Sequence, residues 1–190
     1  MVKRAEGATP VRRLCFDAAA LCMVLALSYL ETALPLGAWL PVPGVKPGLA
    51  NIVITLVFLA VSPKDGAAVS VCRVLISGML FGNPVSVMIS LCGATAAYIA
   101  LCVVYFVPPL KKKLSFIGIS VLCAAFHSLG QLCAVSLIIL SFGAFSYAAI
   151  MLTASCFFGA VNGVILNFLF PSAKKILGDY RSEYEKNKIY

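Results

Sequence analysis

The sequence predicts an all-α membrane protein, a polytopic bundle of six transmembrane helices with both termini in the cytoplasm. Two observations carry this prediction. Hydrophobic residues make up 62% of the 190 residues and charged residues only 12%, whereas a soluble domain averages about 25% charged residues. The basic residues also gather in segments that six crossings would place on one side of the membrane.

The six expected helices are separated by breaks rich in proline, glycine or charge. They cover about residues 14–34, 49–62, 67–81, 85–107, 114–140 and 147–170. Residues 35–48 form the first outer loop, and shorter turns or loops are expected at 63–66, 82–84, 108–113 and 141–146. The expected organisation is thus a basic cytosolic N-terminus (1–13), a transmembrane domain (14–170) and a charged cytosolic tail (171–190) that extends the last helix.

The charge distribution sets the expected orientation. All 15 lysines and arginines lie in predicted cytosolic segments except Lys46, in the first outer loop, and Arg73, inside the third helix. This bias is typical of a multi-pass protein of the plasma membrane. The net charge of +8 is therefore interpreted as an orientation signal, and no nucleic-acid partner is expected.

The sequence offers no set of catalytic or metal-binding residues. It has one histidine and no Walker or G-x-S-x-G motif. The Asp-rich clusters that bind magnesium diphosphate are also missing, so metal-dependent diphosphate chemistry within this chain is not expected. The eight cysteines form no C-x-x-C pair and fall in apolar segments, where they act as small packing residues. No catalytic residue, cofactor or metal is predicted.

The segment 41–51 (PVPGVKPGLAN) interrupts the helical pattern. Its prolines and glycines prevent a regular helix until about Leu49. A helix start exposes unpaired N–H groups and a positive dipole end. Together with Lys46 and Asn51, this helix start is a candidate anion-binding site.

Four ionisable residues fall inside predicted spans, where charge is costly. Asp17 and Arg73 lie toward the inner side, Glu31 lies near the outer end of the first helix, and His127 lies midway along the fifth. By depth, Asp17 could pair with Arg73 and Glu31 with Lys46. The alternatives for Arg73 are an anion contact, a surface for a cytosolic partner, or a side chain that snorkels to the interface.

Two further patterns concern helix packing. His127 and Gln131 are four residues apart and share a helix face, which suits either an interhelical hydrogen bond or a ligand contact. Ser155, Gly159 and Gly163 recur at every fourth position, a spacing that lets helix backbones approach closely.

Residues 43–51 (PGVKPGLAN), followed by 73–78 (RVLISG) and Phe81-Gly82, resemble the bacterial family known both as the Gx transporter family and as heptaprenyl diphosphate synthase component I. The usual family form is close to P-G-I-K-L-G-L-A-N, from which Val45 and Pro47 depart. The resemblance covers about residues 14–170. The family is in turn similar to the substrate-binding S components of energy-coupling factor transporters.

The resemblance implies a non-enzymatic membrane subunit that binds a small molecule, anionic or isoprenoid, from outside. The first loop would act as a lid, and Lys46, Asn51, Arg73, His127 and Gln131 would be the ligand contacts. A coupling membrane subunit and an ATPase pair would supply energy. S components dock through an A-x-x-x-A pattern, which Ala18, Cys22 and Ala26 approach. The alternatives are an accessory subunit of heptaprenyl diphosphate or quinone biosynthesis and a purely structural membrane subunit.

Overall fold

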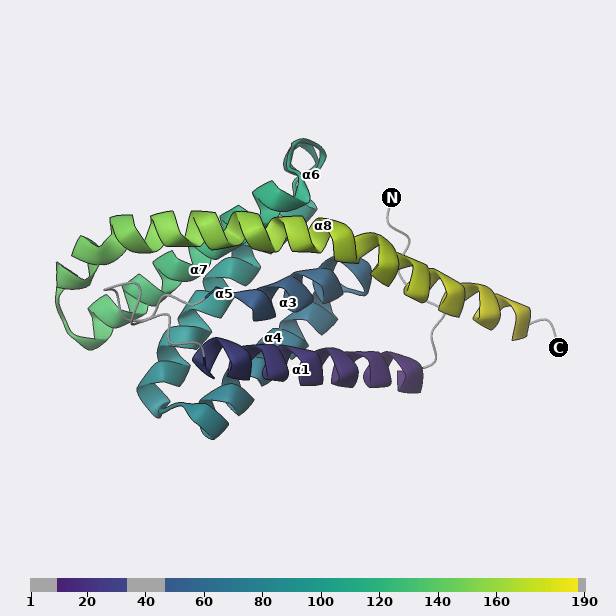
Figure 1. Ribbon diagram of the computed structural model, residues 1–190, viewed down its shortest axis with the longest axis horizontal. Helices are drawn as coiled ribbons and strands as arrows, with labels where there is room; N and C mark the ends of the chain where they lie inside the picture. The colour runs from purple at the N-terminus through teal and green to yellow at the C-terminus, as the bar shows by residue number, and fades with distance from the viewer. Residues whose placement is uncertain (1–9, 34–46, 188–190) are drawn as a thin grey trace.

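The computed structural model describes residues 10–33 and 47–187, and these residues form helices joined by short connections (Figure 1). The helices, in chain order, are α1 (Pro10–Ala33), α3 (Leu49–Ala60), α4 (Pro63–Phe81), α5 (Pro84–Phe106), α6 (Pro108–Lys113), α7 (Phe116–Ile138), the 3-10 helix η1 (Phe142–Tyr147) and α8 (Ala148–Asn187). No strand occurs in these ranges. The predicted all-α fold class is confirmed.

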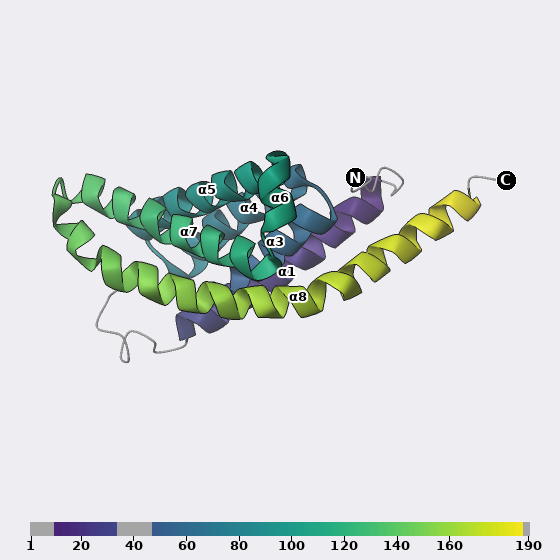
Figure 2. The same cartoon turned by 90° about the horizontal axis from the view of Figure 1, so that it is seen from above.

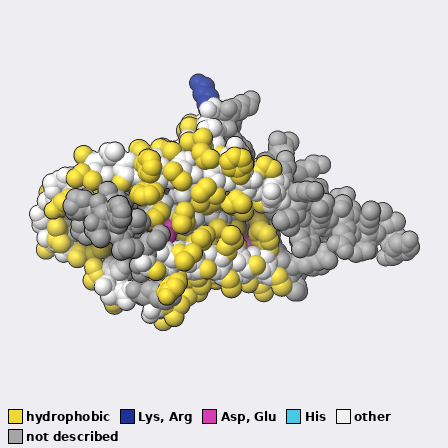
Figure 3. Space-filling view, viewed as in Figure 1, with side chains coloured by type: hydrophobic (Ala, Val, Ile, Leu, Met, Phe, Trp, Pro, Cys, Tyr) yellow, Lys and Arg dark blue, Asp and Glu magenta, His cyan; other side chains and the backbone are white. Residues whose placement is uncertain are grey.

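Four of these helices are long and apolar enough to cross a membrane, namely α1, α5, α7 and α8. Their outer faces expose large hydrophobic side chains, such as Phe106, Leu137 and Phe157, and hydrophobic atoms dominate the face shown in Figure 3. An apolar surface of this extent is suited to lipid. The chain is therefore a membrane protein.

The remaining two of the six predicted spans are α3 and α4. With 12 residues, α3 is only about 18 Å long, and α4 carries Lys64, Asp65 and Arg73. Their crossing of the bilayer stays a prediction. The start of α1 and the end of α8 lie at the same end of the bundle (Figures 1 and 2), as an even number of crossings requires.

Three connections differ from the prediction. Residues 63–66, predicted as a turn, form the first turn of α4, because Ser62 caps this helix by accepting a hydrogen bond from the Lys64 N–H at 3.2 Å and Pro63 occupies its first position. Residues 108–113 form α6 rather than a loop, again with proline at the helix start. Most of the segment 141–146 belongs to the 3-10 helix η1.

The helix ends are otherwise close to those predicted. The largest differences are at α1, which begins at Pro10 rather than Leu14, and at α7, which is shorter by two residues at each end than predicted. The predicted extension of the last helix is confirmed, since α8 continues through Pro171 to Asn187.

The bundle is built from two neighbouring groups. In the first, α1, α3 and α4 pack against one another around a cluster that includes Val24, Val53 and Val57. In the second, α5, α7 and α8 pack in sequence, with α7 in the middle. Contacts of α4 with α5 and of α3 with α8 join the groups. Phe58 of α3 packs with Leu101 and Ile119, and so links α3 to α5 and α7.

The α7–α8 interface is unusually close because glycines line it. A Cβ atom built on Gly163 would lie 2.4 Å from the Ile117 Cα, and one built on Gly159 would lie 2.8 Å from the Val121 Cα. No side chain fits at either point. The predicted use of this spacing for helix packing is confirmed, and the partner of α8 is α7.

Candidate ligand-binding site

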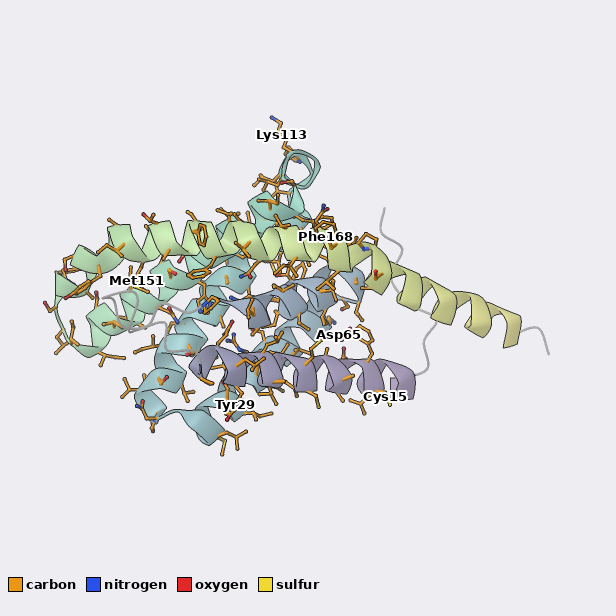
Figure 4. The ribbon with its side chains drawn as sticks, in the orientation of Figure 1. Cys15, Tyr29, Asp65, Lys113, Met151 and Phe168 are labelled. Carbon is orange, nitrogen blue, oxygen red and sulfur yellow. The ribbon has the colours of Figure 1, made fainter. Side chains whose placement is uncertain are left out.

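A polar cavity lies among α1, α3, α4, α5, α7 and α8. Its empty volume is ≈ 780 Å³, open mouth included. It lies toward the end of the bundle where α1 ends, since Met151, which lines it, is in the same half of the molecule as Tyr29, while Cys15 and Asp65 are in the other half (Figure 4). Among the described residues, the lining contains one arginine, one glutamate and one histidine, together with the amides of Asn51, Gln131 and Asn162 and the hydroxyls of Thr55, Ser90, Ser120, Ser128 and Ser155.

Arg73 connects the three helices of the first group. It lies on α4, and its Nε donates a hydrogen bond to the Ser28 Oγ on α1 at 3.0 Å. Its Nη1 donates to the Asn51 Oδ1 on α3 at 3.4 Å. Its Nη2 lies 3.9 Å from the Glu31 Oε2. The guanidinium is thus held in a fixed direction at the cavity wall by groups from two other helices.

The predicted pairing of Arg73 with Asp17 is wrong. Glu31 and Asp17 are 14 positions apart on α1, which separates them by about 21 Å along the helix axis. An arginine beside Glu31 therefore cannot reach Asp17. The depth of Arg73 in the membrane was predicted by counting residues from the start of its helix. That count does not include how α4 is placed against α1, which brings Arg73 to the far end of α1.

Glu31 itself closes the start of α3. Its side chain is only 1% exposed, and its Oε1 accepts a hydrogen bond from the backbone N–H of Ala50 at 3.3 Å. A carboxylate is favourable at a helix N-terminus because of the unpaired N–H groups and the dipole there. The sequence predicted a site for an external anion at this point. The chain's own Glu31 occupies that position.

The residues just before α3 are tied to α8. The Asn162 Nδ2 donates hydrogen bonds to the carbonyl oxygens of Pro47 and Gly48, at 2.8 Å and 3.2 Å. Gly48 has a φ of 72°, in the left-handed region that favours glycine. A Cβ at this position would also lie 3.3 Å and 3.4 Å from the amide nitrogens of Asn51 and Asn162. Gly48 is therefore favoured by its conformation, and a Cβ there would also require a small shift of the Asn51 side chain.

His127 and Gln131 line the opposite wall of the cavity, on α7. Gly93 of α5 packs directly against them, since a Cβ there would lie 2.8 Å from the Gln131 Cγ and 3.1 Å from the His127 Cε1. The close approach of α5 restricts how these two side chains can turn. On the next helix face, the hydroxyls of Ser128 and Ser155 are hydrogen-bonded to each other.

A second cavity, with an empty volume of ≈ 520 Å³ that includes its open mouth, lies between α1, α4 and α5. It shares Glu31, Arg73 and Ser90 with the first cavity. Glu31 and Arg73, the charged pair, therefore lie between the two cavities and form part of the wall of each.

Of the five residues predicted as ligand contacts, Asn51, Arg73, His127 and Gln131 line the same cavity. They come from α3, α4 and α7. The fold thus brings together residues that are as many as 80 positions apart in the sequence, since the first is Asn51 and the last is Gln131. The fifth, Lys46, and its predicted pairing with Glu31 lie outside the described residues. Whether these residues bind a ligand stays a prediction.

Several lining residues were not predicted as contacts. Asn162 is 5% exposed and lies between Gly159 and Gly163. Its amide, in the tightly packed face of an apolar helix, was the signal in the sequence that could have identified it as a lining residue. Ser28, Ser90 and Ser155 gave no comparable signal, because single serines in membrane helices often bond to their own backbone. The Ser155 Oγ indeed donates to the Met151 carbonyl at 2.7 Å.

Comparison with known proteins gives one match. Neither the curated proteins nor the solved structures contain a significant match to this chain. The family model of heptaprenyl diphosphate synthase component I matches residues 19–169, a range that begins within α1 and ends within α8 and includes every described residue of the cavity wall. The chain belongs to the heptaprenyl diphosphate synthase component I family.

Proposed function

We propose that this chain is the ligand-binding subunit of a membrane complex and that its polar cavity holds a small molecule during uptake across the plasma membrane. One observation carries the proposal. A bundle with a lipid-suited surface contains a polar cavity in whose wall the side chain of Glu31 is 1% exposed and that of Arg73 is 12% exposed. Ionisable residues inside a membrane are costly and mark ligand or ion sites.

In this proposal the ligand lies against Asn51 and Arg73 on one wall and His127 and Gln131 on the other. Amides and hydroxyls from α3, α5, α7 and α8 surround it. Lys46, in the segment that precedes Pro47, contributes from the lid. The sequence has no nucleotide-binding motif, so a coupling membrane subunit and an ATPase pair supply the energy.

The outer face of α1 supports a membrane partner of this kind. Ala18, Cys22 and Ala26 are all exposed, and their spacing of four places them along one side of the helix. Small side chains in such a row allow another helix to approach closely.

Native mass spectrometry of the purified protein tests ligand binding. The wild type is expected to retain a small molecule, and Gln131→Ala is expected to lose it because Gln131 lines the cavity. Asn167→Ala is the matched control, since it removes an exposed amide of α8 that does not line the cavity. Equal retention in both variants, or no retained molecule in the wild type, contradicts the proposal. Lys46→Ala tests the lid contact in the same experiment.

A second candidate function follows from the family. Its name describes one component of heptaprenyl diphosphate synthase, which favours a non-catalytic membrane subunit associated with heptaprenyl diphosphate or isoprenoid-quinone biosynthesis. The absence of Asp-rich motifs from the sequence leaves the diphosphate chemistry to a partner in this case. The cavity would then hold an isoprenoid intermediate or its head group.

Co-purification separates the two functions. An ATPase and a coupling subunit in the complex support uptake, and a soluble prenyl synthase supports the biosynthetic role. Ala26→Trp is expected to release a membrane partner that docks on α1, whereas Cys22→Ser, which keeps a small side chain on the same face, is expected to retain it. A partner that resists Ala26→Trp does not dock through this face of α1.

A further inference from the structure

Arg73 and Glu31, the charged pair in the cavity wall, do not form a direct hydrogen bond with each other. The Arg73 Nη2 and the Glu31 Oε2 are 3.9 Å apart, which exceeds the ordinary N–H···O hydrogen-bond distance of about 2.7–3.2 Å. The Oε2 is buried and accepts no hydrogen bond from the described residues. A buried carboxylate oxygen without a donor is costly. The Oε2 is therefore able to accept a hydrogen bond from another group.

The other atoms of the pair are already in use. The Glu31 Oε1 accepts from the Ala50 N–H, and the Arg73 Nε and Nη1 donate to Ser28 and Asn51. Ser28 and Ala50 thus fix the two side chains, so the pair cannot close by a simple rotation of either one. The donor atom Nη2 and the acceptor atom Oε2 lie 3.9 Å apart, and no hydrogen bond joins them.

We propose that the ligand of this cavity places an uncharged edge with adjacent acceptor and donor, such as a carboxamide, lactam or ureide, alongside both Arg73 and Glu31. The ligand carbonyl oxygen accepts from the Arg73 Nη2, and the neighbouring N–H donates to the Glu31 Oε2. The carbonyl oxygen and the amide nitrogen of such an edge are about 2.3 Å apart. One edge that lies beside the pair therefore reaches both Nη2 and Oε2, which are 3.9 Å apart, through two hydrogen bonds of ordinary length. This inference rests on the proposed ligand-binding function and names the class of ligand.

The two opposite charges of the pair disfavour a charged ligand group at this point. Among the described lining residues, Arg73 and Glu31 are the one arginine and the one acidic residue, and no lysine is present. A carboxylate or phosphate at this pair would satisfy Arg73 but would bring a negative oxygen against Glu31. An ammonium group would meet the same problem at Arg73. The pair thus selects by repulsion as well as by attraction.

The inference is tested with two probes of equal size, benzamide and benzoate. Each is added to the purified full-length protein in a non-ionic detergent at about pH 8, where histidine is ordinarily neutral. Binding is measured by thermal shift and isothermal titration. Benzamide is expected to bind the wild type about tenfold more tightly than benzoate, a difference of about 1.4 kcal/mol.

Glu31→Gln gives the sharpest variant. Its amide oxygen can still accept from the Ala50 N–H, but the charge of Arg73 is no longer balanced, so the preference is expected to reverse toward benzoate. The double variant Glu31→Gln/Arg73→Gln removes both charges and is expected to lose discrimination. A Glu31→Gln protein that folds and keeps the wild-type preference overturns the inference.

The wild type alone also decides the question if the variants do not fold. Equal binding of the two probes, tighter binding of benzoate, or no effect of either probe overturns the inference, whichever residue causes it. Such a result leaves the proposed function in place if native mass spectrometry still detects a retained molecule. Absence of any retained molecule is instead a failure of the proposed function.

Discussion

At the α7–α8 interface, Gly159 and Gly163 let two helix backbones come into contact, with no room for a side chain between them. Where α1, α3 and α4 meet near the cavity, the opposite arrangement occurs. Arg73, Glu31 and Asn51 occupy the space between the helices, and two cavities remain beside them. Both regions lie within the same apolar bundle.

The comparison shows two ways in which membrane helices hold together. Lipid is as apolar as a leucine side chain, so apolar burial alone provides little attraction between helices, and close packing or hydrogen bonding must provide it. The glycine interface uses packing and leaves no space. The polar junction uses hydrogen bonds and leaves donors and acceptors that a ligand can use. The first region is suited to be a scaffold and the second to be a site.

The largest expected effect is at the polar junction. Glu31→Ala removes the acceptor for the Ala50 N–H and leaves the charge of Arg73 buried without its partner. Loss of one member of a buried pair costs about 3–5 kcal/mol, so the free energy of unfolding should fall by that amount in a denaturant titration in mixed micelles. A decrease smaller than that measured for Gly163→Ala would mean that the junction contributes less than the glycine interface.

The glycine interface should respond next. Gly163→Ala places a methyl group 2.4 Å from the Ile117 Cα, and overpacking of this kind costs about 1–3 kcal/mol. Thermal unfolding followed by circular dichroism measures the loss. Gly143→Ala is the matched control, because the nearest atom to its Cβ would be the Ser141 Oγ at 3.3 Å. Equal stability of the two variants would show that α7 and α8 can separate freely.

A smaller effect is expected at the start of α3. Gly48→Ala forces a non-glycine residue to adopt a φ of 72°, which costs about 1–2 kcal/mol. The new methyl group also presses on Asn51 and Asn162, so ligand retention should decrease together with stability. Gly118→Ala, at the start of α7 and away from the cavity, is expected to leave ligand retention unchanged.

The smallest expected effect is at Asn162. Asn162→Ala removes the two hydrogen bonds to Pro47 and Gly48. Measured interhelical hydrogen bonds in membranes average about 0.6 kcal/mol and reach about 1.7 kcal/mol, so the loss should fall within that range. Faster hydrogen exchange of the Asn51 amide would show that the loss is local to the start of α3. Unchanged hydrogen exchange of the Asn51 amide would show that Asn162 does not hold the start of α3 in place.

Much of the fold was predictable because membrane helices are local features. Apolar length and the breaks at proline and glycine predicted the six longer helices and their approximate ends, and the Gly159–Gly163 spacing predicted a close packing face. The helix starts at Pro63 and Pro108 were missed because proline both breaks a helix and begins one. Only a capping residue such as Ser62 distinguishes the two uses.

The site was predictable only in part. Asn51, Arg73, His127 and Gln131 were selected because polar groups are rare in spans, and they do line one cavity. The partners of Arg73 were not predictable, because pairing depends on the offset between helices, which depth along the sequence does not give. The role of Glu31 at the start of α3 was missed for the same reason, since 19 residues separate Glu31 from Ala50.

The length of α8 has a mechanical consequence. This helix lines the cavity at Met151, Ser155 and Asn162 and then continues without interruption to Asn187. The 25 residues after Asn162 form a lever arm of about 38 Å, so a tilt of about 5° at the cavity would move its far end by about 3 Å. A spectroscopic label near the end of α8 would therefore convert a small rearrangement around the ligand into a displacement that can be measured at the opposite end of the bundle.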